Sequence, residues 1–434
     1  MKKVVLLLVI LAAFAICIPS ARAQITAQQR NDAINAGLEY LADRQQETGD
    51  GSLYDAGCPY PVALTALAVL KWEEHANKFL KKDPFSNDNP YKDNIVAGWK
   101  YIFQNAVVIN INIEHGGDNP DVNRVNGKGV YFLSPGRNRP LYETGMVMMA
   151  LEASRHPEFI VDALGSPVND SIYLNVMKDA VDYVSWAQND EPNSGRGGWR
   201  YGAYDDGALV LPGLGAPLSD NSVTQWPKLG LMSAGLWGIS APAWVETELN
   251  YWLVYSQAGD GGFWYYGPGS WENVALTASG MIQLTNCGKK TTDPEMQNAI
   301  SYISTNWATG GNDPNIPNLY AMYTVMKASM LAEPEPIVKY GDHNWQNEYD
   351  EWLITNQNLP GGYWPGDSAV VGTGGTNSPI LATEFALLIL QKVAPIEPQP
   401  GPSFNQWGLI SLILVLLALA TWVFFWRRKV VGVR

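Results

Sequence analysis

The sequence predicts an all-α protein, an (α/α)6 toroid of six helical hairpins, with an N-terminal signal and one C-terminal transmembrane helix outside it. Three observations predict this fold. Apolar residues recur at helical spacing through most of the chain, and the helical segments come in pairs. A glutamine, a turn rich in glycine and aromatic residues, and a threonine recur at similar positions in successive pairs. The second helix of each pair is apolar on nearly all sides, as a helix buried in an inner layer must be.

The first 23 residues have the order of a secretory signal peptide. Two lysines precede an apolar stretch over residues 4–18, and the small-residue sequence ARA ends at residue 23. We expect cleavage before Gln24. A lipoprotein anchor at Cys17 is the weaker alternative, because Ile16 stands where a small residue is expected next to such a cysteine.

Residues 24–394 contain the predicted toroid, and the first helix of each of its pairs ends near an aromatic residue. In four pairs a glutamine follows five residues later. The aromatic residues are Tyr40, Tyr101, Tyr183, Trp252, Tyr302 and Trp352, and the glutamines are Gln45, Gln188, Gln257 and Gln357. A turn rich in glycine and aromatic residues comes next, as in the stretch GDGGFWYYGPG from residue 259 onward.

The second helix of each pair carries a threonine in its early turns. The threonines are Thr65, Thr144, Thr224, Thr277, Thr324 and Thr383, and five of them have a leucine seven residues later, which is two helical turns on the same face. Proline at the first helical position predicts a helix start at Pro61 and another at residue 379, where Ser378 would be the N-cap. Ser222 with Gln225 predicts a capping box at the start of a third helix. Strand signals are sparse, and the best lies over residues 106–113.

Six helical hairpins can form an open superhelix or close into a ring with inner and outer layers. The first helices keep a charged face, as in NDAINAGLEYLADRQQ over residues 31–46. The second helices do not, as in ILATEFALLIL over residues 380–390. This asymmetry favours the closed ring, because only an inner helix is covered on all sides.

The C-terminal part predicts a membrane anchor. Residues 395–406 form a proline-rich linker, residues 407–426 hold no charge and are long enough to span a bilayer, and residues 427–434 form a basic tail. Basic residues stay on the cytoplasmic side, so the toroid is expected outside the cytoplasm, at the cell surface. The segment from Pro402 to Ile410 resembles the box of a bacterial C-terminal protein-sorting tail. A permanent anchor and cleavage by a sorting protease therefore both stay open.

Charge and cysteine content exclude several classes of function. The two terminal segments hold seven basic residues and no acids, which leaves 22 basic against 42 acidic residues, a net charge of −20, for the part between them. Such a surface repels nucleic acid, so we expect no nucleic-acid partner. Cys58 and Cys287 are too few for a disulfide scaffold or a zinc site of their own. We expect no metal and no cofactor.

The order of glutamine, glycine-rich turn and aromatic residue resembles the repeats of squalene and oxidosqualene cyclases. Residues 261–284 also resemble a glycine-rich segment of protein prenyltransferase β subunits. The resemblance implies a toroid whose central cavity opens at the N-termini of the inner helices. It does not extend to the catalytic motifs, because the chain lacks the cyclase Asp-x-Asp-Asp motif and the prenyltransferase zinc ligands. Cys58 also does not match the Gly-Cys-x-Glu-Gln pattern of thioester domains that share this fold, because Tyr60 and Pro61 stand where Glu and Gln are expected.

The candidate site residues lie near the starts of the inner helices. The acids are Glu143, Asp220, Glu272 and Glu384, with Tyr142 and Arg200 nearby. Acids in a first helical turn are favoured by the helix dipole, which is a structural role. If they converge on the cavity, they can form a general acid and base pair. The turn tryptophans Trp199, Trp264 and Trp364 either pack between hairpins, as we expect of a turn fastened by Gln257, or contact a ligand.

Two functions remain open from the sequence. The first is a membrane-tethered, outward-facing toroid that lacks the known catalytic motifs and binds a ligand or partner at its cavity, the ligand being a glycan or an apolar small molecule. The second is an enzyme on the same fold, either a glycan lyase or hydrolase or a diverged terpenoid cyclase. An acid pair within about 10 Å in an open, aromatic-lined cavity favours the enzyme.

Overall fold

The computed structural model describes residues 25–111, 119–189, 195–205, 208–209, 219–308, 315–366 and 377–392. The chain divides into two compact units, residues 1–392 and 393–434. The predicted signal peptide, linker, anchor, sorting segment and basic tail lie outside the described residues. Among the helices that are described, none combines the length and the apolar character that crossing a membrane requires.

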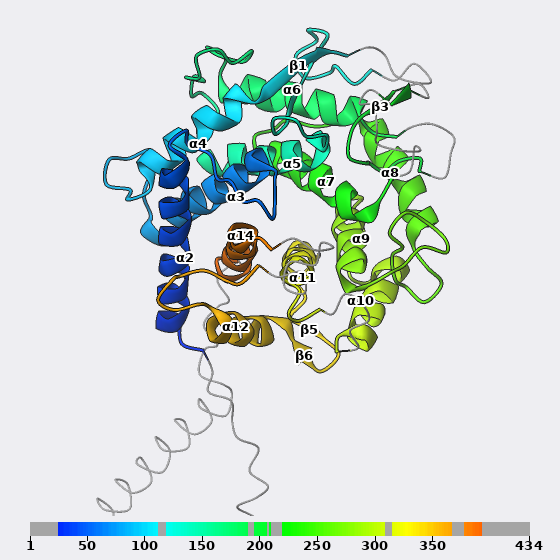
Figure 1. Cartoon of the computed structure of the whole chain (residues 1–434). Coiled ribbons are helices and arrows are strands. Elements are labelled where there is room, and N and C mark those ends of the chain that lie inside the picture. The colour runs from blue at the N-terminus through cyan, green and yellow to red at the C-terminus, as the bar shows by residue number, and fades with distance from the viewer. Residues whose placement is uncertain are drawn as a thin grey trace, which may run out of the picture. The chain divides into compact units, whose positions relative to one another are not determined.

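The described residues form pairs of helices that alternate between an outer and an inner layer (Figure 1). The outer helices are α2 (Ala27–Thr48), α4 (Lys92–Gln104), α6 (Tyr173–Trp186), α8 (Ala243–Ser256), α10 (Pro294–Asn306) and α12 (Trp345–Asn356). The inner helices are α3 (Pro61–Glu74), α5 (Pro140–Ser154), α7 (Asn221–Leu236), α9 (Val274–Asn286), α11 (Leu319–Leu331) and α14 (Pro379–Leu390). A π-helix, η1 (His75–Leu80), extends α3.

The inner helices form a closed ring. Each contacts the next one along the chain, from α3 through α5, α7, α9 and α11 to α14, and α14 contacts α3 again. The outer helix α12 likewise contacts α2, the first outer helix. The predicted closed toroid is therefore confirmed, and the open superhelix is excluded.

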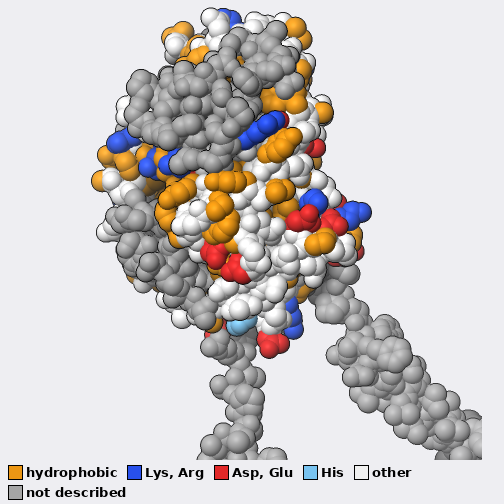
Figure 2. Space-filling model, turned by 90° about the vertical axis from the view of Figure 1, so that its right-hand side faces the viewer, with side chains coloured by type: hydrophobic (Ala, Val, Ile, Leu, Met, Phe, Trp, Pro, Cys, Tyr) orange, Lys and Arg blue, Asp and Glu red, His pale blue; other side chains and the backbone are white. Residues whose placement is uncertain are grey.

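The two layers differ in burial as the sequence predicts. Along α3 every residue from Val62 to Glu73 is buried, because neighbouring inner helices and outer helices cover it on all sides. Along α2 the buried residues recur every three or four positions, which marks one covered face. The face of the molecule on the side of α8 and α10 shows the outer layer, where hydrophobic and charged side chains are interspersed (Figure 2). Exposed apolar side chains of α8 include Val254.

The four glutamines of the sequence pattern fasten each hairpin to the next outer helix. In each case the side-chain Nε2 donates to a carbonyl of its own glycine-rich turn and to a carbonyl near the start of the following outer helix. Gln188, for example, donates to Gly197 O at 2.8 Å and to Val245 O at 2.9 Å. Gln45, Gln257 and Gln357 make the equivalent pairs of bonds. The glutamine is a fastening between repeats, as expected for Gln257.

Each of these turns also places a glycine against the next outer helix. Gly197 has φ +90°, and a Cβ on it would lie 1.8 Å from Glu248 O, three residues beyond the carbonyl that Gln188 binds. The other three turns repeat this arrangement at Gly51, Gly261 and Gly362. Glycine is required here because the left-handed backbone and the close approach both exclude a side chain.

The repeated threonines connect the turn to the inner helix. The hydroxyl of Thr224 accepts the backbone N–H of Trp199 at 3.1 Å and donates to Asp220 O one turn back. Thr65, Thr144, Thr277 and Thr383 accept a backbone N–H of their own turns in the same way. These bonds satisfy backbone groups in buried turns, which would otherwise be costly to bury.

The helix-start predictions have mixed outcomes. Pro61 and the pair of Ser378 with Pro379 do begin α3 and α14, and Ser378 accepts the N–H of Leu381. The capping box at Ser222 was wrong. α7 begins two residues earlier, because the carboxylate of Asp220 accepts the N–H of Val223 at 2.8 Å and is the N-cap.

The sheets in the described residues are short hairpins outside the ring. β1 (Ala106–Asn110) pairs antiparallel with β2 (Lys128–Phe132), with Ala106 opposite Phe132, where the sequence indicated a strand. β3 (Tyr204–Asp205) pairs with β4 (Ala208–Leu209), and β5 (Lys339–Tyr340) pairs with β6 (His343–Asn344).

Candidate functional site: an aromatic cavity at the inner-helix starts

A cavity of about 690 Å³ lies at the N-terminal ends of the inner helices, where the resemblance placed it. All six inner helices contribute residues from their N-caps or first turns. The aromatic members of the lining are Tyr60, Tyr142, Tyr201, Trp226, Tyr265, Trp271, Tyr320 and Phe385. A cavity of this size with mainly aromatic walls and a few polar groups has the character of a small-molecule site.

Glu143 is the predicted acid that lines the cavity. It is fully buried on α5, and its Oε2 accepts the backbone N–H of Ser134 at 3.0 Å and the hydroxyl of the same serine. Burial raises its pKa to about 7, against the lowering effect of the hydrogen bonds from Ser134 and from the Ala63 backbone N–H in the first turn of α3. Its Oε1 has no hydrogen-bond partner in the described structure. Glu143 can therefore exchange a proton near neutral pH.

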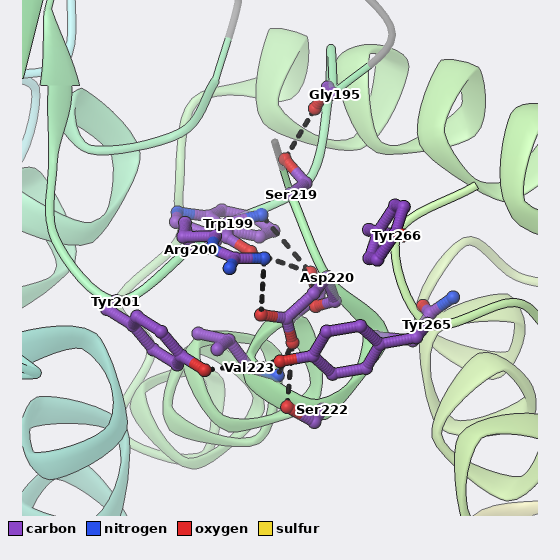
Figure 3. Close-up of polar contacts among 12 residues, drawn as sticks. Gly195, Trp199, Arg200, Tyr201, Ser219, Asp220, Ser222, Val223, Tyr265 and Tyr266 are labelled. Carbon is purple, nitrogen blue, oxygen red and sulfur yellow. Dashed lines mark hydrogen bonds and ion pairs between the residues drawn. The ribbon is translucent and has the colours of Figure 1, made fainter. Parts of the chain in front are cut away.

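Asp220 is close to the cavity wall but fully engaged with the protein (Figure 3). One oxygen accepts the N–H of Val223 and the hydroxyl of Ser222, and the other pairs with the Arg200 guanidinium at 3.2 Å. The Tyr265 hydroxyl also hydrogen-bonds to it. Its pKa is raised by burial, which Arg200 opposes. These bonds make Asp220 a helix cap and an anchor for the cavity wall.

The other two predicted acids do not line the cavity. Glu272 is half-buried beside the Asp260 carboxyl, and burial followed by this neighbour raises its pKa to about 6. Glu384 is fully buried between Leu381 and Phe385, which do line the cavity, and neither of its oxygens has a partner in the described structure. Burial raises the pKa of Glu384 well above its usual value. The four acids are thus not brought together.

The predicted tryptophans are not among the residues that line the cavity. Trp199 and Trp364 are fully buried, and their indole N–H groups donate to carbonyls of the preceding outer helices at 2.9 and 2.8 Å. Trp264 is also absent from the lining, and its backbone forms an isolated antiparallel β-bridge with Glu272. Trp199 and Trp364 therefore fill the space between helices, which is the packing alternative for these two residues. Trp264 is partly buried, and its role stays a prediction.

Tyr142 lines the cavity, and its hydroxyl bonds the Ser222 hydroxyl at 2.7 Å. Burial raises the pKa of Tyr142 well above its usual value. Arg200 lies beside the lining, with its guanidinium 4.9 Å from the Tyr201 ring centre. The wall continues from Tyr265 to the half-exposed Trp271, whose rings stack at 4.4 Å.

Sequence reasoning missed Arg139, the N-cap residue of α5. It lines the cavity between Tyr60 and Tyr201, with its guanidinium 5.1 and 4.6 Å from their ring centres. The signal was present in the sequence, because Arg139 stands directly before Pro140, just as Tyr60 stands before Pro61. Tyr60 and Arg139 both line the cavity, whereas Ser378, which stands before Pro379 in the same way, does not.

Neither cysteine forms a disulfide. Cys58 is buried at the cavity, where burial and the nearby Glu384 raise its pKa to about 12, and Cys287 follows α9. Within the part of the chain that the structure describes, no group of three His, Cys, Asp or Glu side chains is arranged to hold a metal ion.

Comparisons with known proteins bear on the fold. No protein-family model matches the sequence, and no curated protein does. Among solved structures, a GH76 α-mannanase of Bacteroides thetaiotaomicron is similar over 83% of this chain and 94% of its own, with a TM-score of 0.50 and 11% identity. At this identity the likeness shows the fold alone, a helical toroid.

Two other structures are similar at lower TM-scores. Protein geranylgeranyltransferase-I of Candida albicans matches 82% of this chain and 90% of its own, with a TM-score of 0.49 and 11% identity. A type II terpene cyclase from Scytonema matches 86% of this chain and 99% of its own, with a TM-score of 0.48 and 13% identity.

Proposed function

We propose that this protein is a ligand-binding toroid held at the outer face of a membrane, and that its ligand occupies the cavity at the inner-helix N-termini. The observation that carries the proposal is the cavity itself, about 690 Å³ in volume, with eight aromatic residues in its lining. The unpartnered Oε1 of Glu143 supports it, because a buried oxygen in a cavity wall is stabilised by a ligand hydroxyl or other donor.

The lining favours a glycan or an apolar small molecule. Tyrosine and tryptophan offer flat apolar faces with a polar edge, which suits both stacking against a ring and hydrogen bonding to its substituents. Trp271, 54% exposed at the rim, extends this surface outward. The volume is within the range of roughly 300–1,000 Å³ that accommodates small molecules.

The proposed location rests on sequence segments beyond the described residues. Residues 1–23 direct export, residues 407–426 anchor the chain, and the basic tail stays inside. Protease added to intact cells should then digest residues 24–394 and leave a C-terminal tag protected. Protection of the toroid would contradict this placement. Release of a soluble toroid by the cells would favour cleavage of the sorting segment over a permanent anchor.

A second candidate function is an enzyme that uses Glu143 as a general acid. The specific observation in its favour is the pKa of Glu143, about 7, together with the oxygen left free at the cavity. A diverged terpenoid cyclase, which needs a proton donor in an apolar cavity, fits this better than a glycan hydrolase. Hydrolysis of a glycan uses two carboxyl groups, and among the described residues Glu143 is the sole carboxyl in the lining.

One experiment separates the two functions. The purified full-length protein is incubated with glycan and triterpene panels, and bound and altered molecules are both identified by mass. Ala275→Phe, in the lining, is compared with Val254→Phe on the exposed face of α8. Binding that only the cavity variant abolishes, without new products, supports the ligand-binding function.

New products that Glu143→Gln abolishes would instead establish the enzyme. Binding or product formation that survives in Ala275→Phe, with the thermal unfolding temperature unchanged, would place the site elsewhere and contradict both functions.

A further inference from the structure

We propose that the cavity ligand carries a single carboxylate group, and that Arg139 binds this group. The inference rests on the proposed function of the cavity and specifies the chemistry of its ligand. Three observations carry it: the aromatic rings around Arg139, the lack of an ion pair between Arg139 and a described carboxylate, and the starts of α3 and α5 at the cavity.

Arg139 lies against two aromatic rings. Its guanidinium carbon is 5.1 Å from the Tyr60 ring centre and 4.6 Å from the Tyr201 ring centre. A guanidinium that contacts aromatic rings still has its N–H groups available for hydrogen bonds. These N–H groups bind a carboxylate through two parallel hydrogen bonds.

No described carboxylate pairs with Arg139. Other arginines do have acid partners: Arg200 pairs with Asp220, Arg124 with Asp179 and Arg196 with Glu248. The chain holds 42 acidic against 29 basic residues, so a half-buried arginine without an acid partner is unexpected. An anionic ligand supplies the missing partner.

Two helix ends reinforce the positive charge. α3 and α5 begin at Pro61 and Pro140 without a side-chain cap, whereas α7, α9, α11 and α14 are each capped by a side chain. Their N-cap residues, Tyr60 and Arg139, both line the cavity. The first N–H groups of these helices already bond within the protein, Val62 N–H to Ser134 Oγ and Leu141 N–H to Tyr201 O. The two helix dipoles therefore add positive potential near Arg139 without offering these donors to the ligand.

The charges in the lining match one negative charge rather than two. Arg139 is the sole lysine or arginine among the described lining residues, and Glu143 lies one helical turn from it on α5. A phosphate monoester would bring a second negative charge toward Glu143. The body of the ligand would then lie along the aromatic wall that runs from Tyr201 past Tyr265 to Trp271.

Three probes that share a naphthalene ring test the inference by isothermal titration calorimetry on the purified full-length protein, with its lipid or detergent carrier as the blank. They are 2-naphthoate, its neutral analogue 2-naphthamide, and 2-naphthyl phosphate. We expect 2-naphthoate to bind at least about tenfold more tightly than 2-naphthamide, as expected for charge-assisted hydrogen bonds. Arg139→Gln should remove this preference and leave 2-naphthamide binding unchanged, and Arg139→Lys should restore part of it.

Arg137→Gln is the matched control. Arg137 is exposed and contacts the same Tyr60 ring at 5.8 Å, but it does not line the cavity, so its variant should keep the preference. Equal binding of 2-naphthoate and 2-naphthamide to the wild type would overturn the inference and leave cavity binding intact. If 2-naphthyl phosphate bound most tightly of the three, the proposal that the ligand carries a carboxylate group would be wrong. Binding of none of the probes would contradict the inference and cavity binding together.

Discussion

The side-chain Nε2 of Gln357 donates a hydrogen bond of 2.9 Å to the carbonyl oxygen of Ala33, so that the last repeat is fastened to the first. The same Nε2 donates to Gly362 O at 2.9 Å in its own turn. This glutamine does at the seam of the ring what Gln45, Gln188 and Gln257 do between consecutive repeats. The closed ring places all six inner-helix N-termini around one cavity. The cavity therefore depends on the seam, the contact between the last repeat and the first.

The first prediction concerns this seam. Gln357→Ala removes the donor from two carbonyls at a buried position, and we expect it to lower the free energy of unfolding by about 2 kcal/mol. Gln257→Ala should cost less, because Gln257 is half-buried and one of its bonds is 3.4 Å long. Urea unfolding followed by tryptophan fluorescence measures both. An equal cost at the two positions would contradict a special role for the seam.

The second prediction uses two glycines with the same backbone angle. Gly49 and Gly362 both have φ +74°, but a Cβ at Gly49 meets nothing within 4 Å, whereas one at Gly362 would lie 2.4 Å from Ala36 O. Gly49→Ala should cost about 1 kcal/mol from the backbone conformation alone. Gly362→Ala should cost at least about 2 kcal/mol more, because the turn must move away from α2. Similar midpoints of thermal unfolding for the two variants would show that the turn does not press on α2.

The third prediction concerns the pH dependence of stability. The pKa of Glu143 rises from 4.5 to about 7 on folding. The stability that the bound proton provides is complete below pH 4.5 and is lost as the pH rises through 7. Glu143→Gln has no such titration, so its stability relative to the wild type should increase by about 3 kcal/mol between pH 4.5 and 8. Urea unfolding at both pH values checks this, and a constant difference would refute the raised pKa.

The fourth prediction separates the two roles of Asp220. Asp220→Asn keeps an N-cap acceptor for α7 but removes the charge that pairs with Arg200, and we expect a loss of about 2–3 kcal/mol. Asp220→Ala also removes the cap and should cost about 1 kcal/mol more. Chemical denaturation of the two variants gives both numbers. If Asp220→Asn proved neutral, the ion pair would not hold the wall of the cavity.

Much of the fold was predictable because its repeating contacts have constant sequence offsets. The glutamine after the first helix, the glycine in the turn and the threonine in the second helix each bond to groups at fixed positions in the same or next repeat. Gln188, Gly197 and Thr224 show the complete set. Such local geometry repeats with the sequence, and so it can be inferred from the sequence.

The site was less predictable because it depends on how six helix ends are rotated about the cavity. Glu143 and Asp220 occupy similar places in the sequence, yet Ser134 leaves one oxygen of Glu143 free, while Arg200 and the α7 backbone use both oxygens of Asp220. Arg139 carries no motif, and its importance follows from the two aromatic rings that it contacts. These relationships arise only when the ring closes.

Native mass spectrometry of the full-length protein, isolated under mild conditions from the cells that produce it naturally, tests the proposed cavity binding most directly. We predict a bound small molecule that is present on the wild type and on Val254→Phe, is absent from Ala275→Phe, and is released on unfolding. The absence of any added mass on all three proteins, each compared with the mass of its own sequence, together with no binding from the ligand panels, would contradict the account.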